Sequence, residues 1–310
     1  MGHRPYLSAV ASGIGAALVW GGFPVISKLG LEQSLGALDI TALRYLVAGL
    51  ILLPVLISRG FQKLPVFAIA VLVCGAGAPY LLLAVGGLQY APASHFGIIG
   101  PGSMLLFSAL GGRLWQHDRF SAMRILGMVV IVSGILVLGW EGLFAVGENI
   151  WIGDLMFAAA GLFWSGYTLA ARHWRVEPLH SIAIVSVLSM VLFVPPYLLS
   201  DVSHLQTAPP GEILLQAVFQ GLFSATLALL FYTRAVFVLG AARAALFAAL
   251  VPAFACVLSI PVLGEFPTSF QLIGVALVTI GMILGLGLRP VMAVPARSEP
   301  RRDAGEIERD

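Results

Sequence analysis

Residues 91–112 read APASHFGIIGPGSMLLFSALGG, and this stretch decides what kind of fold the chain adopts. It is about as long as the roughly 20 residues that a helix needs to cross the hydrocarbon core of a membrane. Its glycines, Pro101 and His95 are poor choices for a plain apolar helix surrounded by lipid. Such residues are tolerated where neighbouring helices satisfy the freed backbone groups. The stretch therefore indicates a transmembrane helix packed inside a bundle.

The composition of the whole chain agrees with this interpretation. Of the 310 residues, 59% are hydrophobic and only 10% are charged, against about 25% charged residues in soluble domains. A soluble fold is excluded because too few polar residues remain to cover its surface. Ten runs are long enough to span a membrane, and the short connections between them predict one all-α membrane bundle: 7–29, 39–58, 65–86, 91–112, 122–140, 151–171, 180–200, 213–237, 241–262 and 269–288.

The charged residues orient these spans. With the N-terminus placed in the cytoplasm, all but two of the 17 Lys and Arg residues fall on the cytoplasmic side, as the positive-inside rule requires. We therefore predict ten spans with both termini cytoplasmic, in a multi-pass protein of a bacterial inner (plasma) membrane. The predicted outer connections carry acids instead: Glu141, Glu148, Asp201, Glu212 and Glu265.

The chain also repeats itself at an offset near 144 residues. Because five spans are an odd number, the second copy must enter the membrane from the opposite side. Inverted repeats are common in secondary transporters, which bind their substrates near the bilayer midplane between the repeats. The matches are AALVWGG (16–22) with AGLFWSG (160–166), Trp20 with Trp164, Pro54 with Pro195, Pro101 with Pro252, and Gly127 and Gly134 with Gly274 and Gly281.

The sequence further resembles a known family. FYTRAVFVLGAARAALFAALVPAF (231–254), followed by VLGEFPTSFQLIGVALVTIGMIL (262–284), is similar to the EamA repeat of the drug/metabolite transporter superfamily. VWGGFPVISKLG (19–30) and ALRYLVAGLILLP (42–54) resemble the opening of the same repeat, although WQHD (115–118) replaces the expected LGE pattern. The predicted units are a first repeat at 1–145, a second repeat at 146–288 and a disordered cytoplasmic tail at 289–310.

This resemblance implies a ten-helix exporter, facilitator or exchanger of small metabolites, among them aromatic and other amino acids, with a central cavity lined by both repeats. It does not name the cargo. Drugs, cationic compounds and purine-like metabolites are alternatives, and a non-transporting receptor or assembly partner is an alternative of another class. The expected partners are a small-molecule substrate and the lipid bilayer. A net charge of +2 gives no reason to expect nucleic acid, and a homodimer stays open.

Aromatic residues are the first candidates for the cavity. The resemblance implies that aromatics from spans 1, 3 and 6 line it, and Trp20, Tyr80 and Trp164 fall on the matching positions. Tyr232 adds a hydroxyl that needs a partner inside a membrane. Phe23 and Phe247 are weaker candidates. The alternative for each of these residues is core packing.

The remaining candidates are polar or break helices. His95 either hydrogen-bonds a neighbouring helix or lines the cavity, where a neutral imidazole could bind a ligand or sense pH. The set of Gly97, Gly100, Pro101 and Pro252 forms either a gate hinge or tight packing with a static kink.

Lys28 and Arg44 are the two basic residues on the predicted outer side. Their spacing from Glu32 and Asp39 favours structural ion pairs. The alternative is a positive outer mouth that receives a carboxylate or phosphate.

The distribution of acids bears on the energy source. Proton- and sodium-coupled carriers usually keep a carboxylate at membrane depth. Here no acid lies at a span centre, and Asp154 is the deepest, about one turn into its span. We therefore expect facilitated diffusion or exchange, unless His95 or Asp154 carries protons.

Enzymatic activity is not expected. Ser103 and His95 would lie about 12 Å apart along one helix, too far for proton transfer. The sequence has no H-E-x-x-H motif and no clustered acids for a metal. No cofactor or metal is expected.

Overall fold

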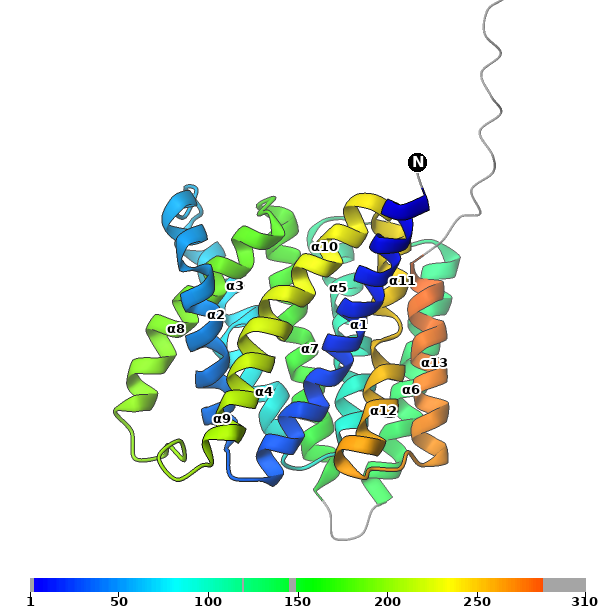
Figure 1. Cartoon of the computed structure of the whole chain (residues 1–310). Helices are drawn as coiled ribbons and strands as arrows, with labels where there is room; N and C mark the ends of the chain where they lie inside the picture. Colours follow the sequence, from blue (N-terminus) through cyan, green and yellow to red (C-terminus); the bar gives the residue numbers. More distant parts are fainter. Residues whose placement is uncertain (1–2, 119, 145–148, 287–310) are drawn as a thin grey trace, which may run out of the picture.

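The computed structural model describes residues 3–118, 120–144 and 149–286, and within them every element is helical (Figure 1). Glu148 and the predicted tail lie outside these ranges. The first repeat contains six elements: α1 (His3–Glu32), α2 (Ala37–Arg59), α3 (Val66–Ala76), α4 (Ala78–Gly87), α5 (Ala93–Trp115) and α6 (Ala122–Phe144). The second contains eight: α7 (Ile150–His173), α8 (Pro178–Leu198), α9 (Pro210–Gln216), η1 (Ala217–Leu227), α10 (Ala228–Leu239), α11 (Ala241–Ala248), α12 (Val251–Leu263) and α13 (Ser269–Gly285).

Each of the ten predicted spans is helical over most of its length. Eight helical segments are long and apolar enough to cross a membrane. The segment α13 is apolar but has only 17 residues. The 24-residue α7 is long enough but less apolar, because it contains polar residues such as Asp154, Ser165 and Thr168. An all-helical membrane protein is therefore confirmed, whereas the count of ten spans stays a prediction.

Three predicted spans are each built from consecutive helical pieces. Gly77 separates α3 from α4, and a Cβ there would lie 2.2 Å from the carbonyl oxygen of Val73. The eighth span contains the π-helical segment η1, where the Thr226 hydroxyl donates to the carbonyl of Gly221, five residues back. The ninth span breaks at Ala249–Leu250, just before Pro252 opens α12. These interruptions break the regular α-helical backbone within each of the three spans.

The two repeats run in opposite directions. Lys28, near the end of α1, donates a hydrogen bond to the carbonyl of Leu88 between α4 and α5. Gly153, near the start of α7, lies against the neighbouring Ala91. The end of α1 and the start of its repeat equivalent α7 therefore lie at the same end of the bundle. Figure 1 shows the start of α1 and the end of α13 together at the opposite end.

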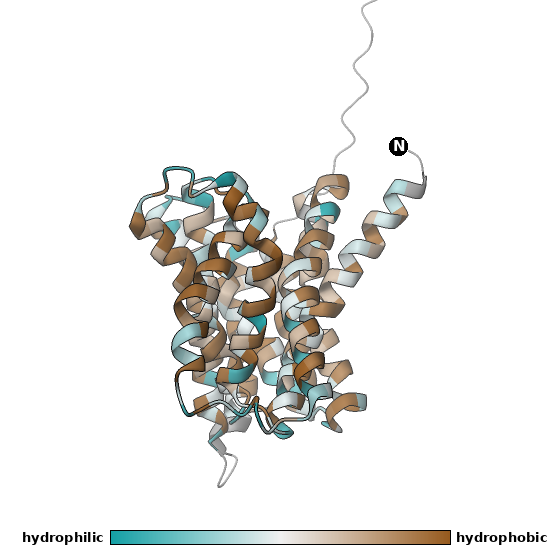
Figure 2. Cartoon of the chain, turned by 60° about the vertical axis from the view of Figure 1, so that its left-hand side comes forward, coloured by the Kyte–Doolittle hydropathy of each residue, from teal (hydrophilic) through white to brown (hydrophobic). Residues whose placement is uncertain are grey.

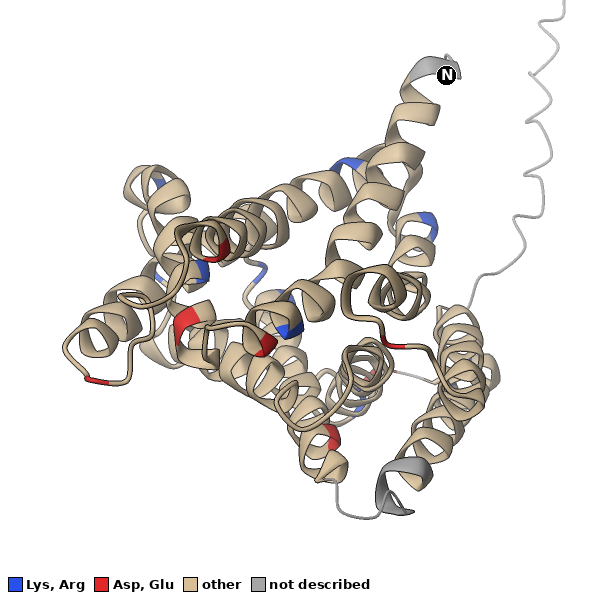
Figure 3. Cartoon of the chain, turned by 60° about the horizontal axis from the view of Figure 1, so that its bottom comes forward, with Lys and Arg blue, Asp and Glu red and all other residues tan. Residues whose placement is uncertain are grey.

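Charges divide between the two ends of the bundle. We call one the acidic end, defined by Glu32, Asp39, Asp154, Glu212 and Glu265 (Figure 3). We call the other the basic end, defined by Arg59, Lys63, Arg113, Arg172, Arg175, Arg234 and Arg243. The division follows the predicted alternation of spans, and the cytoplasmic placement of the basic end stays a prediction.

The outer surface of the bundle is apolar along its length (Figure 2). Large side chains there are exposed, including Leu136 (66%), Leu192 (64%) and Val257 (60%), as expected for a surface that contacts lipid rather than water. Between helices, glycines allow close approach. In the α6–α13 pair, a Cβ on Gly127 would lie 2.7 Å from the carbonyl oxygen of Gly281. The repeated glycines thus pack two helices tightly together, as small residues do in membrane bundles.

Candidate functional site

Four predicted cavity aromatics form two pairs between helices. The ring centroids of Trp20 in α1 and Tyr232 in α10 lie 5.3 Å apart. Those of Tyr80 in α4 and Trp164 in α7 lie 4.8 Å apart. All four side chains are half-buried, and their indole N–H and hydroxyl groups form no hydrogen bond with the described residues. These groups remain free to bind a ligand.

The two weaker aromatic candidates lie in different surroundings. Phe23 is buried and packs against Phe96 with a centroid distance of 5.3 Å, and Phe96 in turn packs against Phe157. This row of rings joins α1, α5 and α7. Phe247 lies in α11, where it packs against the same small apolar cluster as Tyr232 and fills the space above Gly13. Phe23 therefore lies beside the buried Arg44, whereas Phe247 packs near the basic end.

Arg44 is a buried cation. It lies about 10 Å along α2 from the start of the helix, and only 7% of its surface is exposed. Its guanidinium donates to the Ser224 hydroxyl at 2.9 Å and to Gln220 Oε1 at 3.4 Å, both in η1. Its carbon Cζ lies 5.5 Å from the centre of the Phe23 ring. Arg44 therefore joins the first repeat to the π-helical segment of the second.

The predicted ion pair between Arg44 and Asp39 is wrong. Asp39 instead accepts hydrogen bonds from the backbone of Gly36, from the Tyr197 hydroxyl and from the backbone of His204. Residues five positions apart on a helix point about 140° away from each other, which explains why the two side chains do not meet. Within the described chain no carboxylate lies within 4 Å of the guanidinium, and the buried Arg44 Nε has no hydrogen-bond partner.

A chain of amides supports the groups that hold Arg44. Gln220 Nε2 donates to the Ser27 hydroxyl at 2.8 Å and to Gln216 Oε1 at 3.2 Å. Gln216 Nε2 donates to the carbonyl of Ile26 at 2.6 Å. Because these three side chains are almost fully buried, they fix the position of η1 against α1. Two glutamines four residues apart in an apolar span were a visible signal that sequence reasoning missed.

Lys28 makes the local contact that its spacing predicted, but weakly. Its Nζ lies 4.0 Å from Glu32 Oε1, whereas it donates to the carbonyls of Leu88 at 2.7 Å and Ala91 at 3.3 Å. The stronger contacts therefore tie α1 to the connection between α4 and α5. Lys28 and Arg44 do not contact each other, so the structure does not bring them together as one ring.

His95 is fully enclosed by polar partners. Its Nδ1 lies 2.8 Å from Asp154 Oδ1 in α7, and its Nε2 lies 3.3 Å from Gln271 Nε2 in α13. Only 1% of His95 is exposed. With both ring nitrogens engaged, it is not open to cargo in this conformation. The sequence singled out His95 and Asp154 separately, and Gln271 was missed.

Glu265 lies just outside the same network. It belongs to the connection between α12 and α13, and its carboxylate accepts a hydrogen bond of 3.1 Å from the backbone N–H of Ala93 at the start of α5. Burial raises the pKa of the Glu265 carboxyl, an effect that the Ala93 N–H and the Lys28 ammonium oppose. This acid therefore connects the two repeats at the acidic end.

The predicted gate residues have unequal surroundings. Pro101 lies within the continuous helix α5, whereas its repeat equivalent Pro252 lies in the first turn of α12 after a helix break. Gly97 lies against Ala255 of α12, and a Cβ on Gly97 would approach the Ala255 Cβ to 2.5 Å. Gly100 lies beside the Phe96 ring. Tight packing at Gly97 is thus present, and hinge motion stays a prediction.

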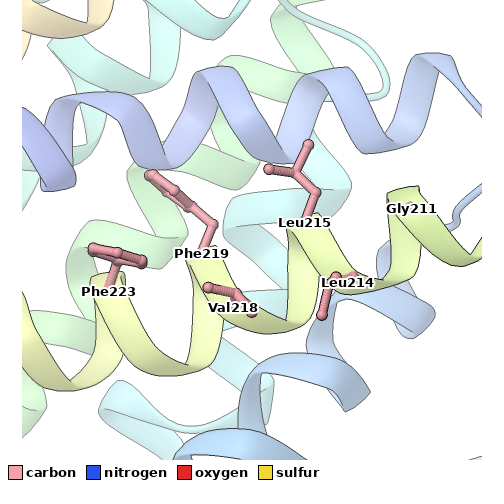
Figure 4. A pocket seen from close by; sticks show the side chains of 6 residues that line it. All are labelled: Gly211, Leu214, Leu215, Val218, Phe219 and Phe223. Carbon is pink, nitrogen blue, oxygen red and sulfur yellow. The ribbon is translucent and has the colours of Figure 1, made fainter.

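Two surface hollows lie apart from the aromatic pairs. One, of about 400 Å³, is an apolar groove along α9 and η1 (Figure 4), lined by Gly211, Leu214, Leu215, Val218, Phe219 and Phe223. The other, of about 380 Å³, lies at the acidic end and includes Asp39 and His204. Neither includes Trp20, Tyr80, Trp164 or Arg44.

Comparison with known proteins gives consistent matches over the whole helical region. The sequence model of the EamA-like transporter family matches residues 7–140 and again residues 151–286. YetK of Bacillus subtilis (strain 168), an uncharacterized transporter, is 25% identical over 295 residues, which cover 91% of this chain and 87% of YetK. YyaM of the same organism, also an uncharacterized transporter, is 26% identical over 208 residues, which cover 65% of this chain and 67% of YyaM. A solved crystal structure, 21% identical, covers 89% of this chain and 96% of its own with a TM-score of 0.62, which shows a shared fold.

Proposed function

The chain belongs to the EamA-like transporter family, within the drug/metabolite transporter superfamily, and from this we propose that it exchanges or exports amino acids, including aromatic ones. The family match and the relatives named as transporters identify a transporter. The proposed mechanism is alternating access around a site between the two repeats, in a bacterial inner membrane with both termini cytoplasmic.

The observation that carries the choice of cargo is the buried Arg44. A buried charge is costly unless a counter-charge compensates it, and the described residues supply hydroxyl and amide oxygens but no carboxylate within 4 Å. A planar guanidinium is suited to bind a carboxylate through two hydrogen bonds. An amino-acid carboxylate would supply the missing counter-charge.

The aromatic residues support the other half of the cargo. Tyr80 with Trp164, and Trp20 with Tyr232, present half-buried ring faces on helices of both repeats. Such faces stack against apolar or aromatic side chains. The proposed cargo site therefore consists of Arg44, Phe23 and these two ring pairs. It does not include His95, whose ring nitrogens are both occupied.

Cationic drugs are a weaker alternative, because Arg44 would repel them. Purine-like metabolites fit the aromatic faces but leave the guanidinium without a counter-charge unless they carry an anionic group. A non-transporting receptor would bind cargo without moving it across the membrane.

Counterflow in proteoliposomes tests the proposal. Purified protein is reconstituted with unlabelled aromatic amino acid inside, and entry of labelled amino acids, cationic drugs and purines is measured at equal pH on both sides. Saturable exchange of amino acids is the expected result. Exchange of cationic drugs alone would refute the cargo class, and binding without exchange of any compound would refute transport.

A further inference from the structure

The network around His95 joins both repeats at the acidic end. His95 lies on α5 of the first repeat, whereas Asp154 on α7 and Gln271 on α13 belong to the second. The Ser94 hydroxyl next to it donates to Gln271 Oε1 at 3.1 Å. Ser94, His95 and Gln271 are buried, and the Asp154 side chain is 12% exposed. Placing an ionisable pair within transmembrane helices has a high free-energy cost, so such pairs are usually functional.

Two hydrogen-bond arrangements satisfy this network, and they differ by one proton. In the first, the Gln271 amide donates to a neutral His95 at Nε2, so the proton of the ring lies on Nδ1 and is donated to Asp154. In the second, His95 carries a proton on both nitrogens and Gln271 turns its amide by half a turn. Its oxygen then accepts from Nε2, and its NH₂ donates to the Ser94 hydroxyl. No backbone movement is needed to pass from one to the other.

The charge of the pair favours taking up a cation. With neutral His95, an ionised Asp154 leaves one negative charge in buried surroundings, and its Oδ2 is a buried acceptor without a hydrogen-bond partner in the described chain. One added proton makes the pair neutral overall. A sodium ion would need several free oxygen ligands, whereas the Ser94 and Gln271 oxygens beside the pair are already hydrogen-bonded to each other. A proton therefore fits this site better than a metal cation.

The neighbouring elements bring few competing charges. None of the other charged groups is hydrogen-bonded to His95, since Lys28 is held by backbone carbonyls and Glu265 by the backbone N–H of Ala93. Asp154 is thus the acid that pairs with it. In α6, the described side chains toward the acidic end carry no charge. Away from the basic end, the described titratable and charged residues on the elements packed around α5 and α7 are Lys28 and Glu32 on α1, Tyr80 on α4, Cys74 on α3, Cys256 on α12, and Glu265 and Tyr90 in connections.

We propose that the His95–Asp154 pair is a proton-binding site that couples proton movement to transport. A hydronium ion gives its proton to His95 Nε2, which forms an imidazolium beside the Asp154 carboxylate and leaves a water molecule. The proton later returns from Nε2 to water. Because the bound proton gives His95 a second N–H donor, which the Gln271 oxygen accepts, and neutralises the pair between α5 and α7, it holds the repeats together at the acidic end. This inference rests on the proposed transport function, and it replaces purely passive exchange by proton-coupled movement.

The experiment separates proton coupling from transport itself. Wild type, His95→Gln and Asp154→Asn are reconstituted, and exchange of aromatic amino acid is measured first at equal pH and then with a pH gradient. His180→Gln is the matched control, because His180 is also fully buried but contacts the carbonyl of Gly60 rather than an acid. Proton movement is followed with a pH-sensitive dye inside the vesicles.

The expected result is accumulation of cargo by wild type and His180→Gln, up to about tenfold per pH unit for one proton per cargo molecule. His95→Gln and Asp154→Asn should exchange cargo at equal pH but lose accumulation and the dye signal. Three outcomes would overturn the proton site but not the transport function. Wild-type exchange could be independent of the pH gradient or depend on sodium instead, or His95→Gln and Asp154→Asn could both still accumulate cargo with the pH gradient. Absence of exchange by wild type at equal pH would overturn the proposed function and this inference with it.

Discussion

Replacing Arg44 by Gln tests the carboxylate site most directly. The substitution removes the charge and the guanidinium that contacts Ser224 and Gln220, and it keeps a polar amide in place of Arg44. A hydrogen bond to a charged group contributes about 1.5–3 kcal/mol. At about 1.4 kcal/mol for each tenfold change, we expect the half-saturation concentration for an amino acid to rise by about 10-fold to 100-fold.

The same change should leave the fold intact. A buried guanidinium without a carboxylate partner is costly to desolvate, and its removal leaves no opposite charge unpaired within 4 Å in the described chain. The melting temperature of Arg44→Gln in detergent should therefore not fall below that of wild type. A matched control lies on the same helix, since Arg59 pairs with Glu177 at the half-exposed basic end. Such exposed pairs contribute about 0–1 kcal/mol, so Arg59→Gln should exchange normally.

Competition is the assay that isolates the carboxylate. Entry of labelled amino acid is measured in the presence of either the unlabelled amino acid or its carboxamide, which lacks the negative charge. Wild type should be inhibited far better by the amino acid, whereas Arg44→Gln should hardly distinguish the two. If the variant keeps the wild-type preference, Arg44 does not bind the cargo carboxylate. If Arg59→Gln loses it equally, the effect arises from protein charge in general.

Three further predictions concern the cargo site, the helix packing and the acidic end. Trp164→Ala should reduce the exchange rate at least about tenfold, because it removes a stacking face. Trp151 lies on the same helix but is 45% exposed, so Trp151→Ala should exchange at the wild-type rate. Equal exchange rates of the two variants would refute the aromatic site. Gly127→Ala should lower the melting temperature, because its Cβ would lie 2.6 Å from a backbone atom of α13. The control Gly139→Ala would place its Cβ in open space and should be neutral or slightly stabilising. Similar melting temperatures of the two variants would contradict the tight α6–α13 contact. Burial raises the pKa of the Glu265 carboxyl, so wild type should lose stability relative to Glu265→Gln as pH rises through that raised pKa. Wild type that gains stability relative to Glu265→Gln as pH rises would contradict the assigned direction.

The helices and their directions could be predicted from sequence because they depend on where apolar and charged residues fall along the chain. Apolar runs set the spans, and the alternation of Arg59 and Arg172 with acids such as Glu212 set the ends to which each helix points. The inverted repeat followed from counting an odd number of spans in each half. None of these inferences required knowledge of which side chains touch.

The contacts of the candidate site could not be predicted in the same way. His95 and Asp154 are 59 positions apart, and their pairing depends on the rotation of α5 against α7. The partners of Arg44 depend on the π-helical backbone of η1, which changes the direction of side chains such as Ser224 along the span. The rotation of one helix against another and the irregular backbone of η1 both depend on how side chains pack. The hydropathy of the sequence does not record this packing.

The repeat also explains how the two ends of the bundle differ. Lys28 and Arg172 occupy equivalent positions, and so do Glu265 and Asp118. At the basic end Arg172 binds Asp118 through two hydrogen bonds of 2.7 and 2.8 Å, and the Arg172 guanidinium holds the pKa of the Asp118 carboxyl below its usual range.

At the acidic end the equivalent residues do not pair within 4 Å, and each binds backbone instead. Lys28 holds the connection between α4 and α5, and Glu265 holds the start of α5. Their contacts therefore draw α1, α5 and the α12–α13 connection together, whereas Asp118 in the α5–α6 connection binds Arg172 of α7 and lies 4.0 Å from Arg124 of α6. The equivalent charges thus make contacts of different kinds at the two ends, with backbone groups at the acidic end and with each other at the basic end.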